Sequence, residues 1–277
     1  LSPLRITLGG GGTDLPSYYR KNEGFLISAA INKYVYVTIL RPFKKGIYLK
    51  YSLLENVQRV KEVKHPIIRE VLKLQNYRPP QIEITALTDI PAGTGLGSSG
   101  SFTTALLRGI YQHNNKKIKS KTLAELACHI EIDRLGEPIG KQDQYISTYG
   151  GLTCFTFKRN NKVLVQPLKL QNSIIEDLNK NLLLFFTGFS RNSGKILKEQ
   201  YLKSKNNDKK MLDNLDFIKE LGFKSREALL SGNTIKFAKL MNEHWEYKKF
   251  RSKDMTNTKI DKWYNAGLKN GAIGGKI

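Results

Sequence analysis

The segment from Pro91 to Ser101 constrains this chain most, because its alternating glycines lie between a strand-like pattern and a helix-like one. Such glycines let the backbone take positive φ angles, so that successive N–H groups can converge on an anion. A helix beginning near Ser98 adds unpaired N–H groups and the positive end of its dipole. The sequence therefore predicts a polyphosphate-binding loop, formed by Gly93, Gly95, Leu96, Gly97, Ser98, Ser99 and Gly100. The alternative is a flexible glycine-rich turn with a serine cap.

Three common glycine-rich phosphate motifs do not fit this segment. A Walker A loop needs a lysine where the chain has Ser101. The dinucleotide-binding fingerprint matches the glycine spacing, but Pro91 interrupts the approach and no acidic residue follows about 20 positions later. The protein-kinase loop needs a valine where Phe102 stands.

Hydrophobic periodicity predicts an α+β fold. Residues 25–40 and 81–87 show strand-like patterns, and the sequence predicts a hairpin formed by Leu152–Phe157 and Val163–Leu168. The composition changes near residue 172, which predicts domains over 1–172 and 173–277. In the second we expect a strand at Leu182–Thr187 and then three or four helices, one carrying Phe237, Leu240, Met241, His244 and Trp245 on one face.

Composition limits the classes of protein this chain can belong to. Its net charge is +22, but the lysines are scattered, which favours a solvated surface that attracts small anionic substrates over nucleic-acid binding. No apolar run approaches the roughly 18–20 residues that a membrane helix needs. The two cysteines, Cys128 and Cys154, have no CxxC spacing, which predicts buried free thiols and a cytoplasmic location.

Three segments, taken in order, resemble the motifs of the GHMP kinases (galactokinase, homoserine kinase, mevalonate kinase, phosphomevalonate kinase). Pro91 to Ser101 resembles the second motif, P-x-x-x-G-L-G-S-S, and Pro3 to Asp14 resembles the first. Gly271 to Ile277 looks like the approach to the third, so the second domain is expected to stop short of it. The resemblance implies an N-terminal lobe like ribosomal protein S5 domain 2, a ferredoxin-like C-terminal lobe, and the use of ATP and Mg²⁺.

Within that family, three segments look most like bacterial D-glycero-D-manno-heptose 7-phosphate kinases: Arg5–Tyr19, Gly140–Tyr145 and His244–Asn257. The resemblance implies phosphorylation of the anomeric hydroxyl to give the 1,7-bisphosphate, for activated heptose and surface polysaccharide. One alternative is another anomeric sugar kinase, such as a fucokinase. A second, from a different class, is a non-catalytic protein of the same fold that binds anions or nucleic acid.

The resemblance also implies roles for individual residues. Asp143 matches the catalytic aspartate of the family's sugar kinases, and Arg5 matches a basic residue that would stabilise charge on the transferred phosphoryl group. Ser99 and Glu131 match the Mg²⁺ ligands. The alternatives are an Asx turn at Asp143, a strand-edge ion pair at Arg5 and an exposed glutamate at position 131.

Substrate binding is expected at two further places. Asp14 matches the family's sugar-binding aspartate, and it follows Gly11, Gly12 and Thr13. Galactokinases have Glu-His where this chain has Gly11-Gly12, which predicts a larger pocket and a longer substrate. Lys141 and Arg251 are candidates for binding phosphate, with a surface lysine and a solvated helix end as the alternatives.

Overall fold

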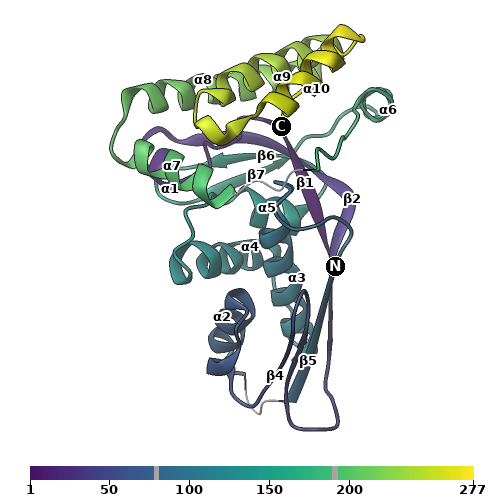
Figure 1. The fold of residues 1–277 in the computed structure, drawn as a ribbon, viewed down its shortest axis with the longest axis vertical. Coiled ribbons are helices and arrows are strands. Elements are labelled where there is room, and N and C mark those ends of the chain that lie inside the picture. Colours follow the sequence, from purple (N-terminus) through teal and green to yellow (C-terminus); the bar gives the residue numbers. More distant parts are fainter. Residues whose placement is uncertain (78–80, 189–192) are drawn as a thin grey trace. The chain divides into compact units, whose positions relative to one another are not determined.

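The structure is a computed structural model that describes residues 1–77, 81–188 and 193–277 (Figure 1). Its elements in chain order are β1 (Ser2–Gly9), α1 (Pro16–Asn22), β2 (Gly24–Leu40), β3 (Gly46–Lys50), β4 (Leu54–Val57), η1 (Val60–Glu62), α2 (Pro66–Leu74), β5 (Gln81–Thr88), α3 (Ser98–His113), α4 (Ser120–Cys128), the π-helical η2 (His129–Arg134), α5 (Gln142–Tyr149), β6 (Leu152–Phe157), β7 (Val163–Pro167), α6 (Asn172–Asn181), α7 (Ser193–Lys205), α8 (Lys209–Leu230), α9 (Thr234–Lys249), η3 (Lys253–Met255) and α10 (Thr258–Lys269). The predicted mixture of strands and helices is confirmed.

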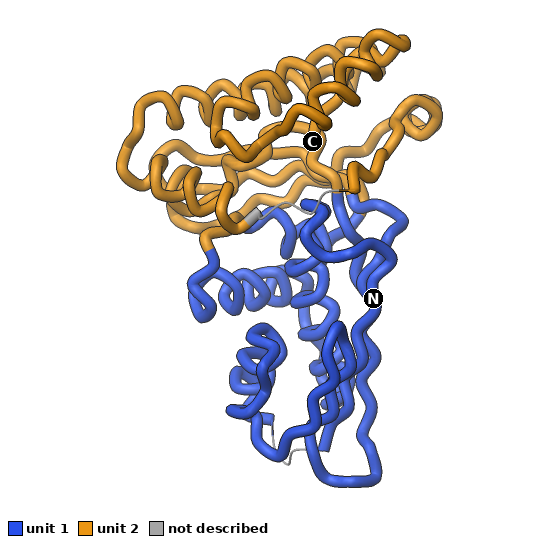
Figure 2. The backbone as a smooth tube through the Cα atoms, viewed as in Figure 1, with its two compact units in different colours: residues 1–5, 30–137, 141–150 blue, residues 6–29, 138–140, 151–277 orange. Residues whose placement is uncertain are grey.

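The chain forms two compact units, each built from separate segments of sequence (Figure 2). β1 and β2 each contribute residues to both units. These units do not test the predicted domain boundary at residue 172, which stays a prediction. The first unit comprises residues 1–5, 30–137 and 141–150, and the second comprises 6–29, 138–140 and 151–277.

A sheet in the order β4-β3-β5-β2 forms the frame of the first unit. β3 runs parallel to β5, and the other two pairings are antiparallel. Because strand side chains alternate between faces, β5 buries Ile82 and Ile84 on one side. These pack with the apolar faces of α2, α3 and α4 in a single core.

The predicted succession of strand, glycine loop and helix is confirmed in this unit. β5 ends at Thr88, and α3 begins at Ser98 directly after the loop. Phe102 and Leu106 of α3 are buried in the core, which ties the loop to a rigid element.

The second unit contains the predicted hairpin. β6 pairs with the first half of β2 and with β7, and a turn at Asn161 with a φ of 70° connects β6 to β7. Apolar side chains of these strands pack against α6, α8 and α9. The predicted α9 face is confirmed, because Phe237, Leu240, Met241, His244 and Trp245 are all buried.

The strand expected at Leu182–Thr187 is not formed, and this prediction is wrong. The segment is irregular chain after α6, and the side chains of Leu183, Leu184, Phe185 and Phe186 are 62–77% exposed. A strand needs a neighbour for its backbone hydrogen bonds. Within the described ranges no strand pairs with these residues.

Cys128 and Cys154 are both buried free thiols, as predicted. None of the helices in the described part of the chain combines the length and the apolar character needed to cross a bilayer.

Candidate active site

The glycine loop adopts the conformation that its sequence predicts. Gly93, Gly95 and Gly97 all have φ between 77° and 81°, a region that side chains disfavour. Gly97 is the N-cap of α3, so the first N–H groups of this 16-residue helix follow the loop directly. The loop and the helix N-terminus together have the geometry of an anion-binding site.

Arg5 connects this loop to Asp143. Its backbone N–H donates to the carbonyl of Leu96 at 3.0 Å, and its Nη1 donates to the carbonyl of Gly95 at 2.8 Å. Its Nε and Nη2 both lie 2.7 Å from Oδ1 of Asp143. The structure thus brings together the two residues expected to be catalytic, and both side chains stay partly exposed.

Glycine is required for this approach at two loop positions. A Cβ on Gly100 would lie 2.6 Å from Cβ of Asp143, and a Cβ on Gly97 would lie 3.2 Å from its carboxyl carbon. The same Gly97 Cβ would lie 3.1 Å from Cγ of Arg5. The glycines therefore serve both the loop conformation and the close packing of the Arg5–Asp143 pair.

Glu131 is buried in η2, with 2% of its surface exposed, so the alternative of an exposed glutamate is wrong. Its Oε2 accepts a hydrogen bond from Nε2 of Gln144 at 2.7 Å, and its carboxylate is also hydrogen-bonded to Ser99. Burial raises the pKa of Glu131 to about 7, against the opposing effect of these hydrogen bonds. A buried carboxylate beside a serine hydroxyl is a donor set that suits Mg²⁺.

Lys141 is the N-cap residue of α5, two positions before Asp143, and only 6% of its surface is exposed. The alternative of a surface lysine is therefore wrong. Its burial beside the first turn of α5 places a fixed positive charge in the same unit as the glycine loop.

The second unit holds the residues from Gly10 to Asp14, which we call the substrate loop. Thr13 is fully buried, with Oγ1 lying 2.8 Å from the carbonyl oxygens of Gly10 and Phe25 and accepting from the Phe25 N–H at 3.1 Å. A Cβ on Gly10 would lie 2.0 Å from the Phe25 carbonyl oxygen, so this position must be glycine. In this structure the Thr13 hydroxyl fixes the loop to the start of β2.

Asp14, at the end of the substrate loop, is 6% exposed. A Cβ on Gly140 would lie 1.8 Å from Oδ2 of Asp14, so glycine at 140 leaves room for this carboxylate. The sequence did not indicate that Asp14 depends on a glycine at position 140, although Gly140 begins the segment Gly140–Tyr145 that resembles the heptose kinases.

Arg251 is buried at the end of α9 rather than solvated, so the alternative of a solvated helix end is wrong. Nε donates to Oδ1 of Asn214 at 2.9 Å, and Nη1 donates to the carbonyl of Gly11 at 2.9 Å. Burial lowers its pKa to about 10, and the negative charge of Asp14 opposes this shift. Arg251 therefore holds the substrate loop from the helical side of the unit.

Gln200 of α7 supports the same loop and was not identified from the sequence. Its Nε2 donates to the carbonyl of Gly12 at 3.0 Å. A Cβ on Gly12 would lie 2.4 Å from Nη1 of Arg251 and 2.8 Å from Nε2 of Gln200. No local pattern could have revealed Gln200, because 188 residues separate it from Gly12.

Comparison with known proteins supports the resemblance found in the sequence. The family described as "GHMP kinases N terminal domain" matches residues 60–151, which include the glycine loop, Glu131 and Asp143. This part of the chain is therefore a GHMP kinase N-terminal domain. The match and the relatives described next indicate an ATP-dependent phosphotransferase, with ATP as the phosphate donor.

Two relatives and one solved structure illustrate the similarity. D-glycero-alpha-D-manno-heptose 7-phosphate kinase of Campylobacter jejuni is 29% identical over 290 residues, covering 99% of this chain and 84% of that protein. A crystal structure of a D-glycero-D-manno-heptose 1-phosphate kinase from Bacteroides thetaiotaomicron matches with a TM-score of 0.78 and 26% identity, covering 100% of this chain and 83% of that one. The bifunctional fucokinase/GDP-fucose pyrophosphorylase of Arabidopsis thaliana is 22% identical, and this chain spans 28% of its length. The predicted GHMP kinase fold is confirmed.

Proposed function

We propose that this GHMP kinase transfers the γ-phosphoryl group of ATP to the anomeric hydroxyl of D-glycero-D-manno-heptose 7-phosphate, giving the 1,7-bisphosphate and ADP. The observation that carries the proposal is the Arg5–Asp143 pair, held against a glycine loop that suits a polyphosphate. The similarity to a heptose 7-phosphate kinase over 99% of the chain supports the choice of sugar. The product would serve the cytoplasmic synthesis of activated heptose for surface polysaccharide.

Asp143 would orient the hydroxyl that attacks. Arg5 occupies Oδ1 of the carboxylate, and within the described residues Oδ2 makes no hydrogen bond. Oδ2 can therefore accept the hydrogen bond of the anomeric hydroxyl and take its proton as the new O–P bond forms and the bond to ADP breaks. Because the transition state is loose, correct orientation contributes more than early removal of the proton.

Positive charge near the loop would stabilise the phosphoryl group in transfer. The side chain of Arg5 is 15% exposed, and its guanidinium is fixed by the Gly95 carbonyl, which supports a contact with the γ-phosphate. Lys141, buried in the same unit, is the second candidate. The N–H groups of the loop and of α3 would hold the remaining phosphates.

Ser99 and Glu131 are the residues that would hold Mg²⁺, and the phosphates and water would supply its other ligands. The ion would neutralise charge on the transferred phosphoryl group. The buried Glu131 carboxylate fits this role, because among the described residues it forms no ion pair that would offset its burial. Asp14 is proposed to bind sugar hydroxyls, and the glycines of the substrate loop would leave room for a heptose.

An ADP-release assay with a panel of acceptors tests the proposal. We expect heptose 7-phosphate to have the highest kcat/KM, ahead of heptose 1-phosphate, fucose and galactose. The Asp143→Asn variant should lose the activity and, with it, this preference. A higher kcat/KM with fucose would favour a fucokinase, consistent with the fucokinase relatives. Salt-sensitive binding of random-sequence DNA without sugar-dependent turnover would favour a non-catalytic binding protein.

A further inference from the structure

The proposed substrate carries a second anion, and this inference rests on that proposed function. A phosphate monoester has a charge of about −1.5 to −2 at pH 7 and three strong acceptor oxygens. A protein site for this phosphate needs several cationic hydrogen-bond donors that the ligand can reach. Arg251 was expected to supply them, but the residue is only 2% exposed, and its Nε and Nη1 already bond Asn214 and Gly11, which leaves Nη2 as its one nitrogen without a partner among the described residues.

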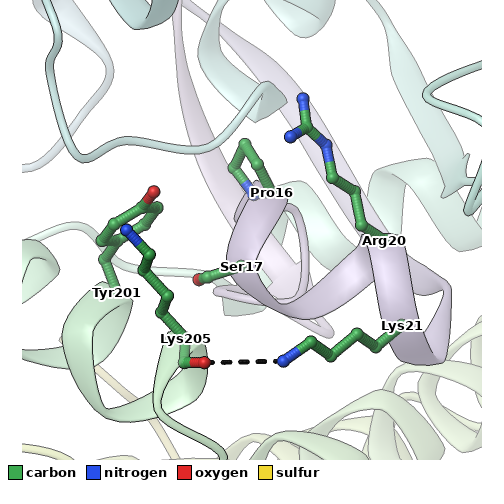
Figure 3. A pocket seen from close by; sticks show the side chains of 6 residues that line it. All are labelled: Pro16, Ser17, Arg20, Lys21, Tyr201 and Lys205. Carbon is green, nitrogen blue, oxygen red and sulfur yellow. Dashed lines mark hydrogen bonds between the residues drawn. The ribbon is translucent and has the colours of Figure 1, made fainter.

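A pocket of about 200 Å³ lies between α1 and α7 in the second unit (Figure 3). Three of its six lining side chains are cationic, and the lining includes no carboxylate. The pocket is lined by Pro16, Ser17, Arg20, Lys21, Tyr201 and Lys205.

The pocket adjoins the substrate loop. Pro16 follows Asp14 by two residues, at the start of α1. On α7, Tyr201 directly follows Gln200, whose side chain bonds Gly12 of the loop. Lys205 lies one helical turn beyond Tyr201, which is about 6 Å along the axis. A ligand bound by the substrate loop could therefore extend a phosphate into this pocket.

Contacts with neighbouring groups restrain part of the lining. Lys21 donates from Nζ to Oδ1 of Asn207 at 2.6 Å, and it also contacts the backbone carbonyl of Lys205 (Figure 3). Nζ of Lys205 lies 5.8 Å from the centre of the Tyr201 ring. Ser17 is hydrogen-bonded to Ser204 at 2.6 Å, which joins α1 to α7.

Arg20 and Lys205 remain exposed, and within the described residues neither side chain forms an ion pair with a carboxylate. Their donors are therefore available to an incoming anion. Arginine offers a planar fork for phosphate oxygens, and lysine adds a mobile charge. A neutral sugar would gain nothing from this set of cations.

We propose that the pocket formed by Arg20, Lys21 and Lys205 binds the distal phosphate of the sugar phosphate substrate. It makes the enzyme selective for a phosphorylated sugar over the same sugar without phosphate. Arg251 then acts from inside the unit by holding the substrate loop.

The test compares the Arg20→Ala/Lys205→Ala double variant with the wild type. We expect KM for heptose 7-phosphate to rise by about tenfold or more, because each charge-assisted hydrogen bond contributes more than a neutral one. KM for ATP and for unphosphorylated heptose should stay unchanged, which a general structural defect would not allow. Lys205→Arg should keep most of the affinity, and Lys209→Ala, an exposed lysine outside the pocket, should behave as the wild type.

A KM for heptose 7-phosphate within twofold of wild type in the double variant would overturn the proposal. Binding of inorganic phosphate, followed by ³¹P NMR, separates this result from a failure of the proposed function. If the wild type does not phosphorylate heptose 7-phosphate but binds phosphate more tightly than the double variant, the pocket is an anion site and only the sugar is wrong. Equal phosphate binding by both proteins would reject the pocket itself.

Discussion

Arg5 directs two nitrogens, Nε and Nη2, to the same oxygen of Asp143, each at 2.7 Å. This arrangement fixes the carboxylate through Oδ1 and leaves Oδ2 for the proposed contact with a substrate hydroxyl. The remaining nitrogen of the guanidinium, Nη1, bonds the glycine loop at Gly95. One arginine therefore sets the position of the proposed base relative to the loop proposed to hold ATP.

Replacing Asp143 by asparagine tests its proposed role as the base that accepts the proton of the substrate hydroxyl. The amide keeps the size of the side chain but cannot take a proton, so kcat should fall by about 10²–10⁴ while ATP affinity is retained. Steady-state kinetics and a thermal melt check both points. Turnover within about threefold of wild type would remove Asp143 from the catalytic role.

Gly100→Ala should displace Asp143 without blocking the loop. The new Cβ would lie 2.6 Å from Cβ of Asp143 and 3.0 Å from its backbone, so α5 must shift. We expect kcat to fall by about tenfold or more, since small misplacements of reacting groups are costly. Gly95→Ala is the matched control: its Cβ meets nothing within 4 Å and only the positive φ is strained. Equal kcat values for the two variants would contradict the packing argument.

Ser99→Ala should weaken the use of Mg·ATP more than it affects stability. The residue is exposed at the start of α3, so removing its hydroxyl creates no cavity. We expect KM for ATP to rise by about tenfold and to recover in part at high Mg²⁺. Ser120→Ala, at the exposed start of α4 and outside the glycine loop, serves as the control. An unchanged KM for ATP, with no response to Mg²⁺, would show that Ser99 is not a ligand.

Glu131→Gln should change how stability depends on pH in metal-free protein. The pKa of Glu131 is about 7 in the folded state and ordinarily 4.5. Between these pH values the Glu131 side chain is therefore protonated in the folded state and ionised in the unfolded state. The wild type should therefore lose stability as pH rises from 4.5 to above 7, by on the order of 1–3 kcal/mol. The glutamine variant cannot ionise and should not show this loss. Melting temperatures of both proteins in EDTA at pH 5 and pH 8 test this expectation. The same change in melting temperature between the two pH values for both proteins would contradict the burial argument.

Arg251→Ala should reduce both stability and sugar affinity. It leaves the Gly11 carbonyl and Asn214 without their donor inside the unit, which typically costs about 1–3 kcal/mol. KM should rise by a similar factor for phosphorylated and unphosphorylated heptose, because the loop itself is disturbed. A rise confined to heptose 7-phosphate, with an unchanged melting temperature, would instead mean that Arg251 contacts the phosphate, as the sequence suggested.

Local patterns were sufficient to predict the glycine loop, the flanking strand and helix, the hairpin and the α9 face. Each depends on periodicity or on residues close in sequence. The Arg5–Asp143 pair spans 138 residues, and only the resemblance to the family connected its members. The burial of Lys141 and Arg251 was not predicted, because lysine and arginine side chains are usually solvated.

The error at Leu182–Thr187 has a different cause. The apolar run from Leu182 to Phe186 fits a strand, but a strand also depends on a partner that its own residues do not specify. In the described part of the chain that partner is missing, and the side chains stay exposed.

The most direct test of the central claim is a ³¹P NMR spectrum of the products formed from ATP and heptose 7-phosphate. We predict ADP and a second phosphomonoester signal coupled to the anomeric proton, in equal amounts, with the original 7-phosphate signal retained. A spectrum showing ATP hydrolysed to inorganic phosphate, or the new phosphate on a hydroxyl other than the anomeric one, would contradict the account.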